Sequence, residues 1–155
     1  MKDIVQRLIR NNKTISTMES CTGGFVVNEI TNISGSSKVL CFSAVTYSNE
    51  YKEKMGVDKK VIDKYTVYSI ETAHDMAKII SNYTKSDYGI GITGKLNKAD
   101  QNNETGEDNK VYISVYDKEK DKFYDTDLYV TNISRKKNKK QVFEELVKLL
   151  KKIII

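Results

Sequence analysis

The chain contains no proline, although average usage of about 5% would give roughly eight in 155 residues. This absence excludes polyproline segments, PxxP peptide ligands and stiff proline linkers. It also excludes a cis-proline turn. The length predicts one domain, residues 1–155, large enough to build its own core.

Cysteine and histidine are also scarce, with two cysteines and one histidine in the chain. Cys21 and Cys41 are too few for a disulfide scaffold and, with one histidine, match no zinc spacing, so we expect no metal. His74 lies inside a predicted helix and is interpreted as an ordinary helix residue. A Ser-His-Asp triad would need it, which argues against that type of site.

Long hydrophobic runs are also missing. No stretch of 18 apolar residues exists, so we expect no membrane span and no membrane partner. Residues 1–10 mix polar and apolar side chains and do not resemble a secretory leader. With free thiols, these features predict a cytoplasmic protein.

Charge is present but unevenly distributed. The formal net charge is +5, yet residues 135–152 hold eight basic and two acidic residues, which leaves −1 for the rest of the chain. The excess is therefore one C-terminal feature, typical of the solvent face of a helix. We expect nucleic acid not to be the partner.

Helical and strand patterns alternate along the chain without a linker, which predicts an α/β fold around one core. Residues 39–47, VLCFSAVTY, are apolar and rich in β-formers and predict a central strand. Residues 94–109 are polar and aperiodic, and loops of that length are usually functional or mobile. The predicted elements are helices over 1–11, 25–30, 50–55, 58–64, 70–83 and 138–152, and strands over 14–18, 39–47, 88–93, 110–116 and 122–130.

Several apparent motifs carry little weight. Residues 89–95 have the GxxxxGK spacing of a phosphate loop, but Leu96 replaces the Ser/Thr that binds magnesium, and Ile90 and Ile92 indicate a strand. Tyr112 and Tyr116 share one strand face but lack a basic-aromatic RNA motif. Cys21 as a nucleophile would need an activating base, so we interpret it as a packing residue.

The most informative segment is the turn Glu19-Ser20-Cys21-Thr22-Gly23-Gly24 between a predicted strand and a predicted helix. Small side chains and free N–H groups at a helix start suit an anion or an oxyanion. Serine and threonine are also ordinary helix caps, so the pattern alone leaves both interpretations open.

Residues 17–24, TMESCTGG, resemble the T-x-E-S-C-T-G-G signature of the CinA C-terminal domain, the nicotinamide-nucleotide amidase family. Residues 47–52, YSNEYK, are similar to its Y-S-N-E-x-K motif, and Met55-Gly56-Val57 to its L-G-V. Ile33-Ser34-Gly35-Ser36-Ser37 resembles its P-G-S-S turn, and residues 91–94 resemble the start of its V-T-G-I-A-G-P loop. The match covers nearly the whole chain.

The resemblance implies a three-layer α/β sandwich with a mixed central sheet, and an amidohydrolase that converts nicotinamide mononucleotide to nicotinate mononucleotide and ammonia. By position, Ser20 is the nucleophile, Lys52 its general base and Tyr47 a member of the same network, while Arg135 meets the phosphate. It implies no cofactor, and suggests a homodimer or other homo-oligomer. The remaining implied substrate-binding residues are Glu19, Cys21, Thr22, Gly23, Gly24, Ser48, Asn49, Thr93 and Gly94.

Elementary chemistry agrees with these roles. A hydroxyl needs an adjacent base, and burial can depress the pKa of a lysine enough to provide one. The helix after Ser20 is expected to donate N–H groups to the oxyanion. Composition alone, however, would make Lys52 a solvated residue of a lysine-rich helix, and Arg135 one of a basic run.

The chain departs from the family pattern in its substrate loop, where T-G-I-A-G-P-x-G-G reads Thr93-Gly94-Lys95-Leu96-Asn97-Lys98-Ala99-Asp100. Lys95 or Lys98 either replaces a lost backbone contact to phosphate or blocks the site. The G-A-V-S turn likewise reads Thr66-Val67-Tyr68-Ser69. Two alternatives therefore stand beside the amidase: a nucleotide-binding module without turnover, and a competence or DNA-associated protein.

Overall fold

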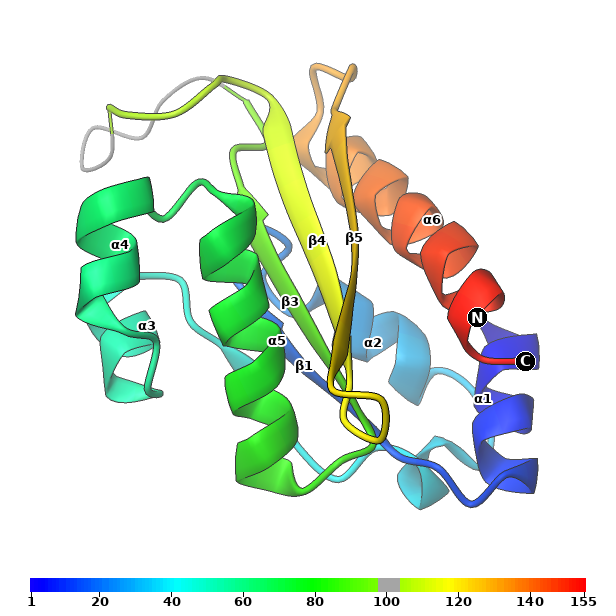
Figure 1. Ribbon diagram of the computed structural model, residues 1–155. Coiled ribbons are helices and arrows are strands. Elements are labelled where there is room, and N and C mark those ends of the chain that lie inside the picture. Colours follow the sequence, from blue (N-terminus) through cyan, green and yellow to red (C-terminus); the bar gives the residue numbers. More distant parts are fainter. Residues whose placement is uncertain (98–103) are drawn as a thin grey trace.

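The computed structural model describes residues 1–97 and 104–155. A five-stranded sheet in the order β2-β1-β3-β4-β5 is covered on one face by α3, α4 and α5 and on the other by α1, α2 and α6 (Figure 1). This arrangement confirms the expected three-layer α/β sandwich. The strands are β1 (Ile15–Glu19), β2 (Ser43–Val45), β3 (Tyr88–Gly94), β4 (Lys110–Asp117) and β5 (Lys122–Tyr129). The helices are α1 (Lys2–Arg10), α2 (Phe25–Thr31), η1 (Ser36–Lys38, a 3₁₀ turn), α3 (Asn49–Lys54), α4 (Lys59–Tyr65), α5 (Ile70–Thr84) and α6 (Arg135–Ile153).

The sheet is mixed, as expected. Strand β1 pairs in parallel with both β2 and β3, whereas β4 pairs antiparallel with β3 and β5. The carboxyl ends of β1, β2 and β3 therefore meet at one edge, the position where open α/β sheets bind their ligands. Residues that follow Glu19, Val45 and Gly94 all emerge there.

Strand β3 is built so that helix α5 can lie directly on it. Its two isoleucines, Ile90 and Ile92, face the larger core cluster, while Gly89 and Gly91 face α5. A Cβ on Gly91 would lie 2.1 Å from the carbonyl oxygen of Ala73, and one on Gly89 would lie 2.0 Å from that of Ala77. Glycine in this strand therefore marks close backbone approach.

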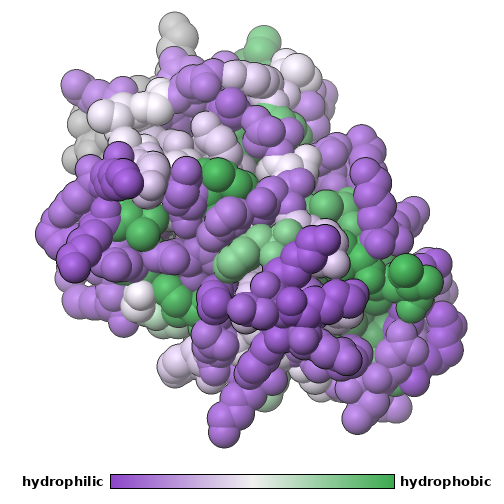
Figure 2. Space-filling view, in the orientation of Figure 1, coloured by the Kyte–Doolittle hydropathy of each residue, from purple (hydrophilic) through white to green (hydrophobic). Residues whose placement is uncertain are grey.

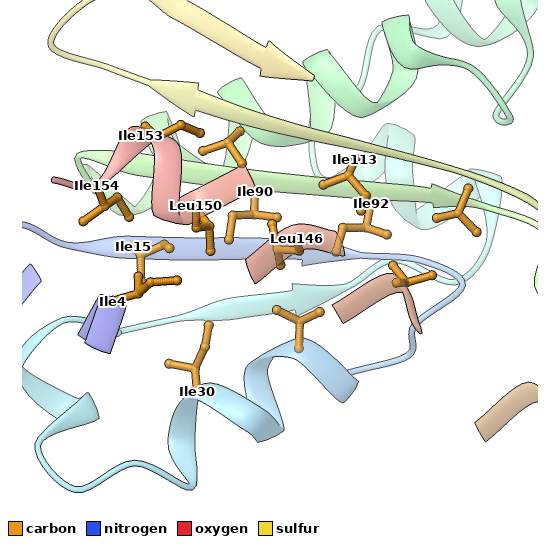
Figure 3. Packing of buried hydrophobic residues seen from close by; sticks show 14 of the residues in the cluster. Ile4, Ile15, Ile30, Ile90, Ile92, Ile113, Leu146, Leu150, Ile153 and Ile154 are labelled. Carbon is orange, nitrogen blue, oxygen red and sulfur yellow. The ribbon is translucent and has the colours of Figure 1, made fainter. Parts of the chain in front are cut away.

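The larger core cluster lies between the sheet and helices α1, α2 and α6. Isoleucine and leucine side chains from all three helices and from β1, β3 and β4 meet there (Figure 3). A smaller cluster on the opposite face joins Met18 of β1 to Met76 and Ile80 of α5. The sheet thus buries both of its faces, as a parallel core requires.

The predicted central strand over 39–47 is wrong. Only three residues of it form β2, and β2 lies at the edge of the sheet. The hydrophobicity of the segment has mixed causes: Val39 packs in the larger cluster and Ala44 in the smaller one, whereas Phe42 and Val45 are exposed. Its apolar run does not reflect burial on two faces.

The other elements agree with the sequence prediction within a few residues. Residues 110–129 form the expected hairpin, and helix α6 keeps its apolar stripe inside and its basic residues outside. Ile154 is buried, and its carbonyl accepts a hydrogen bond from Arg7 at 3.0 Å, which holds the two ends of the chain together. Lys98 and the rest of 98–103, the middle of the predicted loop, lie outside the described residues.

The surface is predominantly hydrophilic on the face in view, where hydrophobic residues form separate patches (Figure 2). Among the residues that the structure describes, no helix combines the length and the apolar character needed to cross a membrane.

Replacement of Gly91 by alanine tests the contact between β3 and α5. The added methyl group would overlap the Ala73 carbonyl, so we expect Gly91→Ala to lower the free energy of unfolding by about 2 kcal/mol or more in urea titrations. Lys118→Ala, at an exposed turn, is the control and should change it by less than about 0.5 kcal/mol. Equal effects of the two substitutions would show that α5 can move away at little cost.

Candidate active site

Ser20 follows β1 directly and begins a tight turn at the carboxyl edge of the sheet. Its N–H donates to the Ile92 carbonyl of β3 at 3.0 Å, and its own carbonyl accepts from the Gly23 N–H at 3.0 Å. Gly23 and Gly24 have φ values of +60° and +88°, a conformation that side chains rarely adopt. The Gly-Gly pair therefore allows the chain to turn from β1 into α2 behind the serine.

Glu19 supports this turn from beneath. Its fully buried carboxylate accepts hydrogen bonds from the N–H groups of Gly24 at 3.1 Å, Val26 at 3.1 Å and Val27 at 2.8 Å. These are the donors at the start of α2, so the expectation that this helix serves the oxyanion is wrong. A negative charge built into the protein already satisfies them.

Two other N–H groups of the turn remain to be considered as donors to an oxyanion. Within the described residues, the backbone N–H groups of Cys21 and Thr22 donate no hydrogen bond to another residue. Cys21 follows the serine immediately, the usual position of an oxyanion donor relative to a nucleophile, and it lines the pocket, whereas Thr22 does not. The Cys21 N–H is therefore the candidate to stabilise negative charge next to Ser20.

Lys52 is buried, which overturns the composition-based interpretation of a solvated residue. It lies on the short helix α3 but is only 2% exposed. Its Nζ lies 2.9 Å from Ser20 Oγ and 2.9 Å from the carbonyl oxygen of Thr46. Burial lowers the pKa of Lys52 to about 8, because the ammonium form loses its hydration.

This pair has the geometry of an activated nucleophile. A neutral amine has two N–H bonds and one lone pair. When one N–H donates to the Thr46 carbonyl, the lone pair can accept the Ser20 proton. A pKa near 8 leaves part of the Lys52 population neutral at physiological pH.

Tyr47 and Arg135 form a second pair, which faces solvent. Arg135 is the first residue of α6, and its Nη2 donates to the Tyr47 hydroxyl at 3.2 Å. Tyr47 is 61% exposed, and its hydroxyl contacts the arginine instead of Lys52. The Tyr47 hydroxyl thus pairs with Arg135 at the wall of the pocket that also holds Lys52, and its implied part in the Ser20–Lys52 network stays a prediction.

One pocket contains both pairs. Of the implied site residues, Ser20, Cys21, Tyr47, Asn49, Lys52, Gly94 and Arg135 line it. Val67, Tyr68 and Leu96 also line it, although the sequence motifs assigned no role to them. Tyr68 lies in the altered G-A-V-S turn, which was the available signal. Lys95, which the changed substrate loop indicated as a residue that contacts phosphate or blocks the site, lines the pocket as well.

The remaining implied residues lie behind the pocket and shape its walls. Ser48 caps α3 by accepting a hydrogen bond from the Tyr51 N–H, which orients the helix that holds Lys52. The Thr93 hydroxyl donates to the Val67 carbonyl and so fixes a wall residue. Glu19, Thr22, Gly23 and Gly24 form the support of the Ser20 turn.

Cys21 and His74 behave as structural residues. Burial raises the pKa of the Cys21 thiol to about 12, so it stays protonated beside Ser20. The His74 Nε2 lies 2.8 Å from Asp125, and its ring stacks on Phe123 on the outer strand of the sheet. No three His, Cys, Asp or Glu side chains in 1–97 and 104–155 are grouped to hold a metal ion.

These features define an α/β protein with a buried Ser–Lys pair at the carboxyl edge of its parallel strands. The family model of the CinA C-terminal domain matches residues 1–154, and the chain belongs to that family.

Curated relatives and solved structures agree with the assignment. A "Putative competence-damage inducible protein" of Thermoanaerobacter sp. (strain X514) is 42% identical over 96 residues, which are 61% of this chain and 23% of that protein. A "CinA-like protein" of Kosmotoga olearia is 45% identical over the same shares. The aligned part is thus less than a quarter of these relatives' length.

Two crystal structures show the same fold at low sequence identity. A CinA superfamily protein from Escherichia coli superposes with a TM-score of 0.89 at 20% identity, covering 98% of this chain and 87% of that chain. A competence/damage inducible protein from Agrobacterium tumefaciens gives 0.80 at 24% identity, covering 96% and 94%.

Glu19→Gln tests the support of the Ser20 turn. The amide loses the charge and turns one oxygen acceptor into a donor that faces N–H groups. We expect the free energy of unfolding to fall by about 1–3 kcal/mol, measured by urea titration. Glu29→Gln, farther along α2, is the matched control. A stability loss shared equally by both variants would contradict a specific role for the Glu19 carboxylate.

Proposed function

We propose that the protein is an amidohydrolase that removes the carboxamide nitrogen of nicotinamide mononucleotide and uses Ser20 as nucleophile and Lys52 as general base. The observation that carries this proposal is the 2.9 Å contact between Lys52 Nζ and Ser20 Oγ in a buried site. Family membership supports it, since the family resembled by the sequence motifs carries this activity.

The first half-reaction needs one proton to move twice. Ser20 Oγ attacks the amide carbon while its proton passes to the neutral Lys52 amine. We assign the stabilisation of the oxygen that becomes negative to the backbone N–H of Cys21, a residue that lines the pocket and whose N–H donates to no other residue in the described part of the chain. Lys52 then returns the proton to the departing nitrogen, which leaves as ammonia, and an acyl ester remains on Ser20.

The second half-reaction repeats the cycle with water. The oxygen of a water molecule attacks the ester carbon while Lys52 accepts a proton from that water. Lys52 then returns the proton to Ser20 as the acid is released. The Thr46 carbonyl keeps the amine oriented in both halves. Arg135, a guanidinium at the pocket wall, suits the phosphate of the nucleotide.

The pH dependence of ammonia release follows from Lys52. Because the base works in its neutral form and burial lowers the pKa of Lys52 to about 8, kcat/KM should rise about tenfold per pH unit below that value and level off above it. Ammonia release from nicotinamide mononucleotide, measured from pH 6 to 10, checks this. A profile that stays flat across this range would contradict a lysine base.

Substitutions distinguish the catalytic contribution of Lys52 from that of the neighbouring lysines. Ser20→Ala and Lys52→Met should each lower kcat by about 10²- to 10⁴-fold with the fold intact, because each removes one partner of the proton transfer. Lys54→Met, on the same helix but exposed and paired with Glu50, is the control and should keep full activity. Comparable ammonia release from Lys52→Met and wild type would exclude the proposed base.

A further inference from the structure

The wall of the pocket carries a buried cation that the Ser20–Lys52 chemistry does not use. Lys95 follows β3 directly, and its side chain is only 4% exposed. It stands where the family's T-G-I-A-G-P loop has an apolar residue. A buried ammonium is costly unless its charge is compensated, so its surroundings indicate its purpose.

The protein compensates this charge only in part. The Lys95 Nζ donates to the Gly106 carbonyl at 3.1 Å and lies 4.9 Å from the centre of the Tyr68 ring. Its one carboxylate partner among the described residues, Asp108, is 3.6 Å away and half-exposed. That distance allows an ion pair but is too long for a hydrogen bond. An ammonium has three N–H donors, so Lys95 has capacity for another acceptor.

The charge balance of the pocket points in the same direction. Its lining residues include three with basic side chains, Lys52, Lys95 and Arg135, and none with an acidic one, within the part of the chain that the structure describes. A concave wall of one sign concentrates ligands of the opposite sign. A neutral amide would gain nothing from Lys95 and Arg135, whereas an anionic one would.

We propose that Lys95 is a substrate-binding residue of this chain, which with Arg135 recognises the phosphate of a mononucleotide amide. The inference rests on the proposed function and adds to it a second cation for the phosphate of the substrate. Lys95 takes no part in bond making. Its contribution is a charge-assisted hydrogen bond to the end of the substrate that does not react.

Equilibrium binding tests this without requiring turnover. Calorimetry measures the binding of nicotinamide mononucleotide and of nicotinamide riboside, which lacks the phosphate. Each ligand is titrated into the Ser20→Ala protein and into the Ser20→Ala, Lys95→Met double variant. We expect the second substitution to weaken mononucleotide binding about 10- to 100-fold, the range for hydrogen bonds to charged groups. Riboside binding should be equal in the two proteins, and Lys95→Arg should restore part of the loss.

A matched control distinguishes ligand binding by Lys95 from a purely structural contribution of a lysine in this region. Lys110 also lies over tyrosine rings and contacts the same segment through Glu107, but it does not line the pocket. Lys110→Met in the same background should leave mononucleotide binding unchanged. Equal losses for the Lys95 and Lys110 variants, equal losses for both ligands, or no mononucleotide binding at all would overturn the proposal. Ammonia release by the wild type is scored separately, so binding without turnover would refute the amidase and leave Lys95 supported.

Discussion

A lysine held away from water is the constraint on which the site depends. Burial lowers the pKa of Lys52 from 10.5 to about 8, a bias of about 3 kcal/mol toward the neutral amine. The surrounding elements keep water away from the amine and orient it: Thr46, directly after β2, accepts a hydrogen bond through its carbonyl, Ser48 caps the helix, and the Ser20 turn supplies the hydroxyl. Access of water to the amine would return Lys52 toward an ordinary ammonium.

The sheet explains why distant residues meet. Ser20, Thr46 and Lys95 follow three neighbouring parallel strands at one edge, so residues up to 75 positions apart in the sequence lie together around one site. The buried carboxylate of Glu19 accepts from the N–H groups at the start of α2, so the oxyanion candidate is the Cys21 N–H that precedes them. The site thus stands on strands and buried caps, which hold geometry better than exposed loops.

Much of this was predictable from sequence, and the failures have physical causes. Periodicity gave the hairpin and α6, and the ESCTGG and YSNEYK motifs gave Ser20 and Lys52. Hydrophobicity misplaced residues 39–47, because an apolar run does not reveal whether its side chains share one environment. The role of Glu19 as a cap could not be predicted from the sequence. Its carboxylate accepts hydrogen bonds from backbone N–H groups, which every residue type except proline carries, so no residue pattern marks them. Val67 and Tyr68 line the pocket through tertiary packing, and the altered turn that contains them was the one sequence signal for it.

The central claim is that Lys52 is neutral over part of the physiological pH range, and NMR titration of its side-chain amine tests it most directly. Selective labelling of lysine, with Lys52→Met protein to assign the signal, gives the pKa of this one group among its many solvated neighbours. The account predicts a midpoint of about 8 for Lys52. A midpoint near the ordinary 10.5 would contradict it, because the amine could not then accept the Ser20 proton at neutral pH.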